Sequence, residues 1–161
     1  MAYTSRVLVV ARQTAASDDL RDALLQRAQR GPIAITLLMP APSIGMDGRE
    51  AARAGLDAAL DKLRTAGLDA EGVVGDSDPV EAVLETWVPG RFDEVVVSTL
   101  PGASSRWLEM DFPHRVSRIC DVPVTHVTAK APGRFRTGPP PQHQSEPLGP
   151  LAPMAWAGPK R

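Results

Sequence analysis

The residues best suited to chemistry gather in the segment "STLPGASSRWLEMDFPH", residues 98–114. Thr99, Ser104 and Ser105 supply hydroxyl groups, and Arg106 supplies a guanidinium. Together these groups can bind an anion through charge-assisted hydrogen bonds. The segment directly follows the apolar run "DEVVV", so it lies where a buried strand would end. An ordinary solvated loop is the alternative interpretation of the same residues.

Histidine and cysteine give no further chemical site in this sequence. His114, His126 and His143 share no metal-ligand spacing with Cys120 or with one another, so no metal site is predicted. Asp121 follows Cys120, and an adjacent acid raises a thiol pKa, which disfavours a reactive thiolate. No Ser-His-Asp set can be placed either. We therefore predict no enzymatic activity.

Apolar runs and helical patterns alternate along the chain, and the strands and helices that they predict must position residues 98–114. The expected strands are residues 6–11, 33–39, 69–76, 92–98 and 123–129. The expected helices are residues 17–31, 49–67, 78–88 and 112–120. Strands that alternate with helices favour a parallel sheet covered on both faces, and right-handed crossovers make it doubly wound. Ligands then bind beyond the carboxyl ends of the strands, where the loops after Ala11 and Val97 are expected to meet.

Helix caps support these boundaries. Ser17 is a good N-cap for the first helix. Asp78 caps the third helix, with Pro79 at the first helical position and Glu81 completing a capping-box pattern. Asp111 is predicted to cap the last helix, with its carboxylate on the free N–H groups that could otherwise hold a phosphate.

Composition and charge narrow the class of protein. The chain has 161 residues, a formal net charge of -1 and one cysteine, which fits a reducing, cytoplasmic setting. No apolar run approaches the roughly 20 residues of a membrane helix. The chain outside its C-terminal end is acidic and shows no basic stripe, so neither nucleic acid nor a membrane is an expected partner.

The C-terminal end differs from the rest in composition. Residues 129–161 hold eight of the 16 prolines and five basic residues against a single acid, a net charge of +4. They show neither strand nor helix periodicity, so we predict one domain at residues 1–129 and a disordered tail at 130–161. The tail is either idle or a docking segment for a partner protein, through Met154 and Trp156.

Two segments carry a resemblance to a known family. "GDSDPVEAVLETWVPGRFDEVVVS" and "RVSRICDVPVTHV" resemble the third helix with the fourth strand, and the final helix with its strand, of universal stress proteins. The resemblance covers about residues 5–128. It implies an α/β fold with a doubly wound, five-stranded parallel sheet sandwiched by helices, of strand order 3-2-1-4-5.

Many members of that family bind ATP through a loop of the form Gly-x2-Gly-x9-Gly-Ser/Thr after the fourth strand. Glycines let backbone N–H groups approach phosphate oxygens, and the last pair lies at a helix N-terminus. Placed on this chain, the loop positions fall on Ser98, Pro101, Asp111 and Phe112, and the family's first-strand aspartate falls on Ala11. All five residues differ from the motif, so ATP binding in the family's usual mode is not expected.

The resemblance also implies a homodimer, because family members commonly pair through the last strand. That strand would lie at a sheet edge, where Val124, His126 and Thr128 are expected at the interface. The sequence therefore predicts a regulatory or interaction protein of stress response, without a cofactor. The alternative is a protein that binds ATP, another adenine nucleotide or a different anion with the hydroxyls and guanidinium described first.

Overall fold

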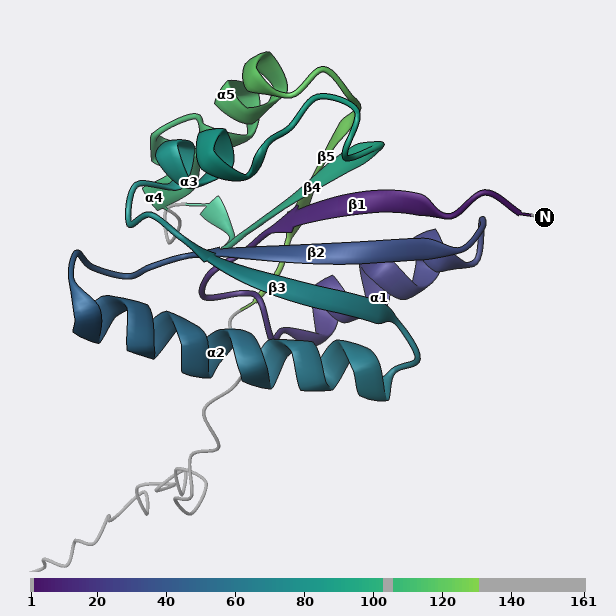
Figure 1. Ribbon diagram of the computed structural model, residues 1–161, viewed down its shortest axis with the longest axis horizontal. Helices are drawn as coiled ribbons and strands as arrows, with labels where there is room; N and C mark the ends of the chain where they lie inside the picture. The colour runs from purple at the N-terminus through teal and green to yellow at the C-terminus, as the bar shows by residue number, and fades with distance from the viewer. Residues whose placement is uncertain (1, 103–105, 131–161) are drawn as a thin grey trace, which may run out of the picture.

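The protein folds around a sheet of five parallel strands, seen in Figure 1. The computed structural model describes residues 2–102 and 106–130. The strands are β1 (Ser5–Val10), β2 (Ile33–Pro40), β3 (Asp69–Gly75), β4 (Glu94–Thr99) and β5 (Val124–Thr128). Their spatial order is β3-β2-β1-β4-β5, and every neighbouring pair is parallel. The predicted doubly wound sheet of order 3-2-1-4-5 is confirmed.

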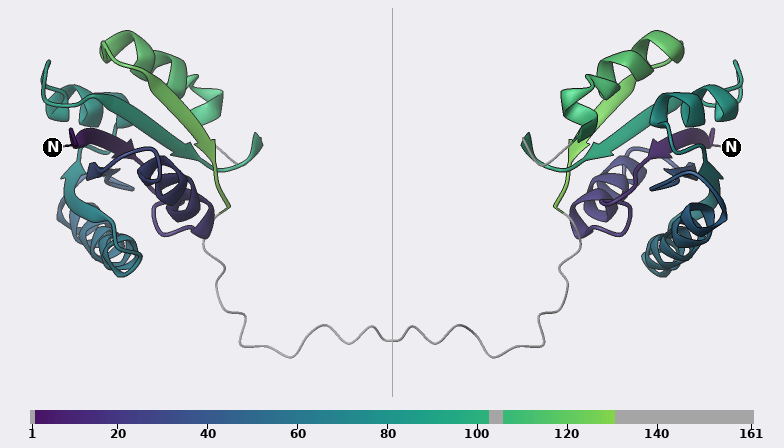
Figure 2. Two further views of the ribbon diagram at one scale, coloured as in Figure 1. Left: turned by 90° about the vertical axis from the view of Figure 1, so that its right-hand side faces the viewer. Right: turned by 90° about the vertical axis from the view of Figure 1, so that its left-hand side faces the viewer.

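Helices cover both faces of the sheet, as the two opposite views in Figure 2 show. The helices are α1 (Asp18–Ala28), α2 (Met46–Thr65), α3 (Pro79–Thr86), α4 (Arg106–Glu109) and α5 (Phe112–Ile119). Helices α1 and α2 lie on one face, and α3, α4 and α5 lie on the other (Figure 1). This arrangement follows from right-handed crossovers, because the chain runs from β1 to β2 and β3 in one direction and then adds β4 and β5 on the other side of β1.

The strands alternate their side chains between two separate hydrophobic cores. In β1, Val7 and Val9 point to the core under α1 and α2, whereas Leu8 and Val10 point to the core under α3 and α5. All four are 0% exposed, as expected for a central strand buried on both faces. Their burial explains why the run "RVLVVA" is continuously apolar instead of alternating with polar residues.

Side-chain caps begin two of the helices as predicted. The Ser17 hydroxyl accepts the Leu20 N–H at 3.1 Å. The Asp78 carboxylate accepts the Val80 N–H at 2.8 Å, with Pro79 at the first helical position. The other half of the capping box is wrong, because the Asp78 N–H donates to the Asp76 carboxylate at 2.8 Å and not to Glu81.

Three local predictions around the helices are corrected by the structure. Helix α2 begins at Met46, three residues before the predicted start, and Gly45 accepts the Arg49 N–H at 3.2 Å. The short helix α4 was not predicted. Asp111 precedes α5 as expected, but it adopts a left-handed conformation with φ of 54° and makes no side-chain cap bond. The prediction that its carboxylate caps the helix is therefore wrong.

Two parts of the sequence-based prediction fall largely outside the described residues. Residues 131–161 of the predicted tail lie outside them, as do Ser104 and Ser105 of the predicted anion-binding set. Lys130 is described, and its backbone N–H donates to the Asp19 carboxylate at 3.0 Å. Within the described ranges, no helix combines the length and apolar character needed to cross a bilayer.

Candidate anion-binding site

The loops after β1 and β4 meet beyond the carboxyl ends of these two strands. The chain leaves β1 toward β2 on one side and returns to β4 on the other, so the strand order reverses here. The hydroxyls of Thr14 and Ser98 lie 2.7 Å apart, and both side chains are buried. The meeting of the two loops, expected from the sequence, is confirmed.

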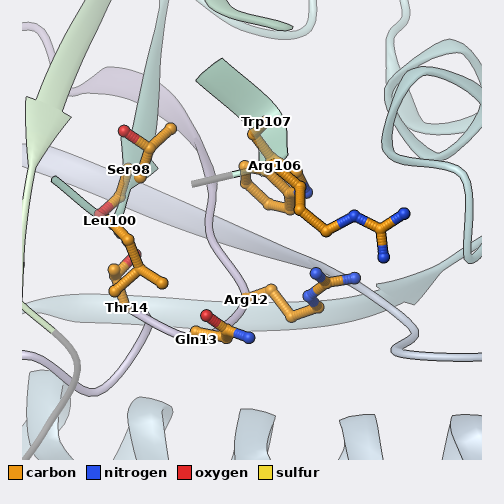
Figure 3. Close-up of a pocket in the computed structure, with 8 residues that line it drawn as sticks. Arg12, Gln13, Thr14, Ser98, Leu100, Arg106 and Trp107 are labelled. Atoms are coloured by element: carbon orange, nitrogen blue, oxygen red, sulfur yellow. Dashed lines mark hydrogen bonds between the residues drawn. The ribbon is translucent and has the colours of Figure 1, made fainter. Parts of the chain in front are cut away.

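A small pocket opens at this meeting point, shown in Figure 3. Its volume is about 110 Å³. Residues from three segments line it: Arg12, Gln13, Thr14, Ser98, Thr99, Leu100, Arg106 and Trp107. Thr99 and Arg106 of the predicted anion-binding set are thus brought together.

Two arginines give the pocket its charge. Figure 3 shows the Arg12 side chain, from the loop after β1, and the Arg106 side chain, from the start of α4, extending to the same side of the pocket. Arg12 is half-buried, and its guanidinium carbon lies 5.7 Å from the centre of the Trp107 ring. Burial lowers the pKa of Arg12, and the nearby charge of Arg106 lowers it further. Among the side chains that the structure describes, neither guanidinium pairs with a carboxylate.

Trp107 anchors the α4 segment to the domain. Its side chain is 6% exposed and packs at a tilt against Phe112, with ring centres 4.9 Å apart. Phe112 is 0% exposed and belongs to the core under α3 and α5. The indole ring of Trp107 therefore packs against the core through Phe112, and it also makes a cation–π contact with Arg12.

Comparison with solved structures gives the fold a precedent. The complex of a universal stress protein with cAMP is 22% identical, with a TM-score of 0.58, and the match covers 81% of this chain and 100% of that one. A universal stress protein from Archaeoglobus fulgidus is 16% identical, with a TM-score of 0.58, over 78% of this chain and 99% of that one. The chain has the universal stress protein fold.

Another structure of that fold, from Archaeoglobus fulgidus in complex with dAMP, is 14% identical. Its TM-score is 0.54, and the match covers 80% of this chain and 100% of that chain. No family model matches the sequence, and no curated protein matches it. The solved structures therefore establish the fold of this chain and do not by themselves assign its ligand.

Five residues are predicted from the sequence to take the place of the family's nucleotide-binding residues, and the structure gives the surroundings of each. Ser98 is 0% exposed and bonds to Thr14. Pro101 has no N–H to offer a phosphate. Phe112 fills the core, and Asp111 stands in the left-handed conformation before it. Ala11 is fully buried and has no polar side chain.

The predicted interface residues all lie on β5, at an edge of the universal stress protein sheet. Val124 is half-buried, whereas His126 and Thr128 are exposed. The His126 ring Nε2 lies 2.6 Å from the Thr99 hydroxyl, so the edge strand contacts a residue of the pocket. No partner chain is part of the structure, and the interface stays a prediction.

Arg12 and Trp107 belong to the pocket, and neither was in the predicted site set. The sequence held one usable signal for Arg12, because it directly follows the first strand at the edge where the loops were expected to meet. No cluster of three or more His, Cys, Asp or Glu side chains able to hold a metal occurs among the described residues. Cys120 is buried, and burial raises its thiol pKa to about 11, which makes it unreactive.

Proposed function

We propose that this protein is a non-enzymatic regulatory or interaction module of stress response that does not hold ATP through a glycine loop. One observation carries the proposal: Phe112, at the position of the loop's final hydroxyl residue, is 0% exposed and belongs to the hydrophobic core. Its neighbour Asp111 would place a carboxylate beside any phosphate bound there, and like charges a few Å apart repel strongly.

The proposal includes the setting of the protein. We place it in the cytoplasm, as a homodimer through β5, with the C-terminal tail available to a partner protein. The single cysteine and the exposed edge strand support this setting. Neither a membrane nor nucleic acid is a proposed partner.

A second candidate function is binding of an adenine nucleotide or another anionic small molecule. The pocket with Thr99 and Arg106 at the strand-order reversal favours it, since ligands of doubly wound sheets bind there. Two structures of the same fold are complexes with cAMP and dAMP. In this second function, the side chains that line the pocket would bind the anion in place of the backbone N–H groups of a glycine loop.

Nucleotide analysis distinguishes the two functions. The purified protein is denatured, its supernatant is examined for nucleotide, and the native protein is titrated by calorimetry with ATP, AMP and cAMP. The first function predicts no co-purified nucleotide and no saturable heat. Stoichiometric nucleotide, or micromolar binding of any of the three, would overturn it and support the second function. The Arg106→Gln variant then shows whether the nucleotide uses the pocket, and Arg30→Gln, at an exposed arginine after α1, is the matched control.

A further inference from the structure

The pocket beyond β1 and β4 concentrates positive charge without a described counter-charge. Arg12 and Arg106 both line it, and their charges are close enough for Arg106 to lower the pKa of Arg12. Arg12 is also half-buried, so it has lost part of its hydration. By comparison, the partly buried guanidinium of Arg27 is neutralised by an ion pair with Glu94 at 2.7 Å.

We infer that Arg12 and Arg106 form a side-chain site for a small oxyanion, namely free phosphate or the phosphate group of a monoester. This inference rests on the second proposed function and gives its ligand a chemical class. A guanidinium presents parallel N–H donors in a fixed fork that matches phosphate oxygens. An oxyanion between the two guanidiniums would also relieve their mutual repulsion and replace the hydration that Arg12 has lost.

The hydroxyls on the opposite wall can complete the site. Thr14 and Ser98 share one hydrogen bond at 2.7 Å, in which one hydroxyl donates and the other accepts. The accepting hydroxyl keeps its own proton, so the pair can offer one further hydrogen bond. Thr99 adds a third hydroxyl to the lining, and this hydroxyl also lies 2.6 Å from the His126 ring Nε2. The pocket thus offers neutral donors on one wall and charged donors on the other.

The size of the pocket favours a small anion over a whole nucleotide. Its volume of about 110 Å³ lies below the roughly 300–1,000 Å³ of sites that enclose drug-sized ligands. Trp107 makes the site rigid, because its buried ring holds the Arg12 guanidinium at 5.7 Å by a cation–π contact. Trp107 is therefore a positioning residue in this scheme, and it also provides a fluorescent reporter of the site.

Thermal unfolding and calorimetry of the full chain test the site. Sodium phosphate is titrated near neutral pH at constant ionic strength, with chloride making up the difference, and AMP and adenosine are titrated in parallel. We expect the melting temperature to rise with phosphate and to saturate, because only the folded state has the site. Trp107 emission should change over the same concentration range, and this change should be absent in Trp107→Phe.

Charge-matched variants localise the effect. Arg12→Gln and Arg106→Gln should each weaken phosphate binding roughly tenfold or more, since each removes charge-assisted hydrogen bonds. Arg12→Lys keeps the charge but not the fork and should lie between Arg12→Gln and the unchanged protein. Arg30→Gln makes the same charge change at an exposed position outside the pocket and should leave the affinity unaltered. Circular dichroism confirms that each variant is folded.

Four outcomes separate the inference from the proposed functions. Saturable phosphate binding that requires both arginines supports it, whether or not AMP also binds. AMP binding that requires both arginines and is tighter than adenosine binding also supports it, because the phosphate group then contributes to affinity. If AMP binds no more tightly than adenosine and phosphate does not bind, the inference fails whether or not the second function stands. If chloride raises the melting temperature as much as phosphate, or Arg12→Gln binds phosphate as well as the unchanged protein, the inference is overturned.

Discussion

Asp93 ties the start of β1 to the segment before β4. Its carboxylate accepts the Arg6 backbone N–H at 2.7 Å and the Tyr3 hydroxyl at 2.9 Å, and it pairs with the Arg6 guanidinium at 3.3 Å. These hydrogen bonds, chiefly those from Arg6, lower the pKa of Asp93 from 3.8 to about 2. The ionised form is therefore the one that stabilises the fold.

Asp93 makes stability depend on acid pH in a defined direction. Because the pKa is lower in the folded protein, the contribution is complete above about pH 5 and is lost progressively as the pH falls through 3.8 and then through about 2. Asp93→Asn should lower the melting temperature at neutral pH by roughly 2–4 °C and flatten its decline across that window. Asp61→Asn, at an exposed acid, is the control. An unchanged pH profile in Asp93→Asn would contradict the assignment.

Phe112 is the residue whose burial most separates this loop from a phosphate loop. Phe112→Ala should cost about 3–5 kcal/mol of unfolding free energy, because it empties a fully buried site between the core and Trp107. Urea unfolding measures the loss. Leu84→Ala, at a side chain 49% exposed, should cost less than about 1 kcal/mol. Equal losses in the two variants would show that the Phe112 ring is not part of the core.

The starts of α3 and α5 differ although an aspartate precedes each helix. Asp78 has extended geometry and bonds to two helical N–H groups, whereas Asp111 is left-handed and bonds to none with its side chain. An L residue pays a conformational cost in the left-handed region that glycine avoids. Aspartate thus caps α3 through its side chain, whereas before α5 it adopts a mildly strained left-handed backbone conformation and caps nothing with its side chain.

This difference predicts opposite effects of substitution. Asp78→Ala should destabilise the protein by about 1 kcal/mol, through loss of the cap bonds. Asp111→Gly should stabilise it by up to about 1 kcal/mol, through relief of the left-handed strain. Chemical denaturation of both variants, compared with Asp61→Asn as a neutral reference, measures the pair. A loss for Asp111→Gly as large as that for Asp78→Ala would mean that Asp111 acts as a cap after all.

Most elements follow from local signals, and the failures have local causes. Apolar runs placed β1, β2 and β4 within one or two residues, because strands buried on both faces need nearly unbroken apolar sequence. The loop "APSIGMDG" hid the start of α2, since Gly45 and Gly48 disfavour a helix by propensity. Four residues are too few for periodicity to reveal α4. The backbone angle of Asp111 has no sequence signature, because aspartate tolerates both conformations.

At the scale of the whole molecule, β5 leaves one side of the sheet open. Its odd-numbered positions bond to β4, as shown by the Val95 N–H on Pro123 and the Ala129 N–H on Thr99. Because parallel strands direct alternate residues to opposite neighbours, the backbone groups of the even-numbered positions face outward. The predicted interface residues Val124, His126 and Thr128 are those even-numbered positions.

The open edge gives a test of the proposed dimer. Thr128→Pro removes an outward N–H and should weaken self-association at least tenfold while the monomer stays folded. Val127→Pro removes an N–H that β4 needs and should destabilise the domain itself. Sedimentation measures association, and circular dichroism measures folding. A dimer unaffected by Thr128→Pro would place the interface elsewhere.

The overall architecture was easier to predict than the pocket. Alternating elements and a single handedness rule leave few topologies, so the resemblance needed only to select one strand order. The pocket depends on where long side chains reach, and no spacing rule shows that Arg12 crosses toward Arg106 over Trp107. The hydroxyl of Thr99 was found because it lies at a strand end, where the fold class itself points to ligands.

The bond between Thr14 and Ser98 has a consequence for which substitutions the domain tolerates. Introducing glycine at position 98 alone would leave the Thr14 hydroxyl, 1% exposed, without the partner it has here. A buried hydroxyl without a partner costs roughly 1–3 kcal/mol, a large share of the stability of a small domain. Each position thus constrains the other, and a glycine at position 98 is tolerated best when position 14 loses its hydroxyl in the same step.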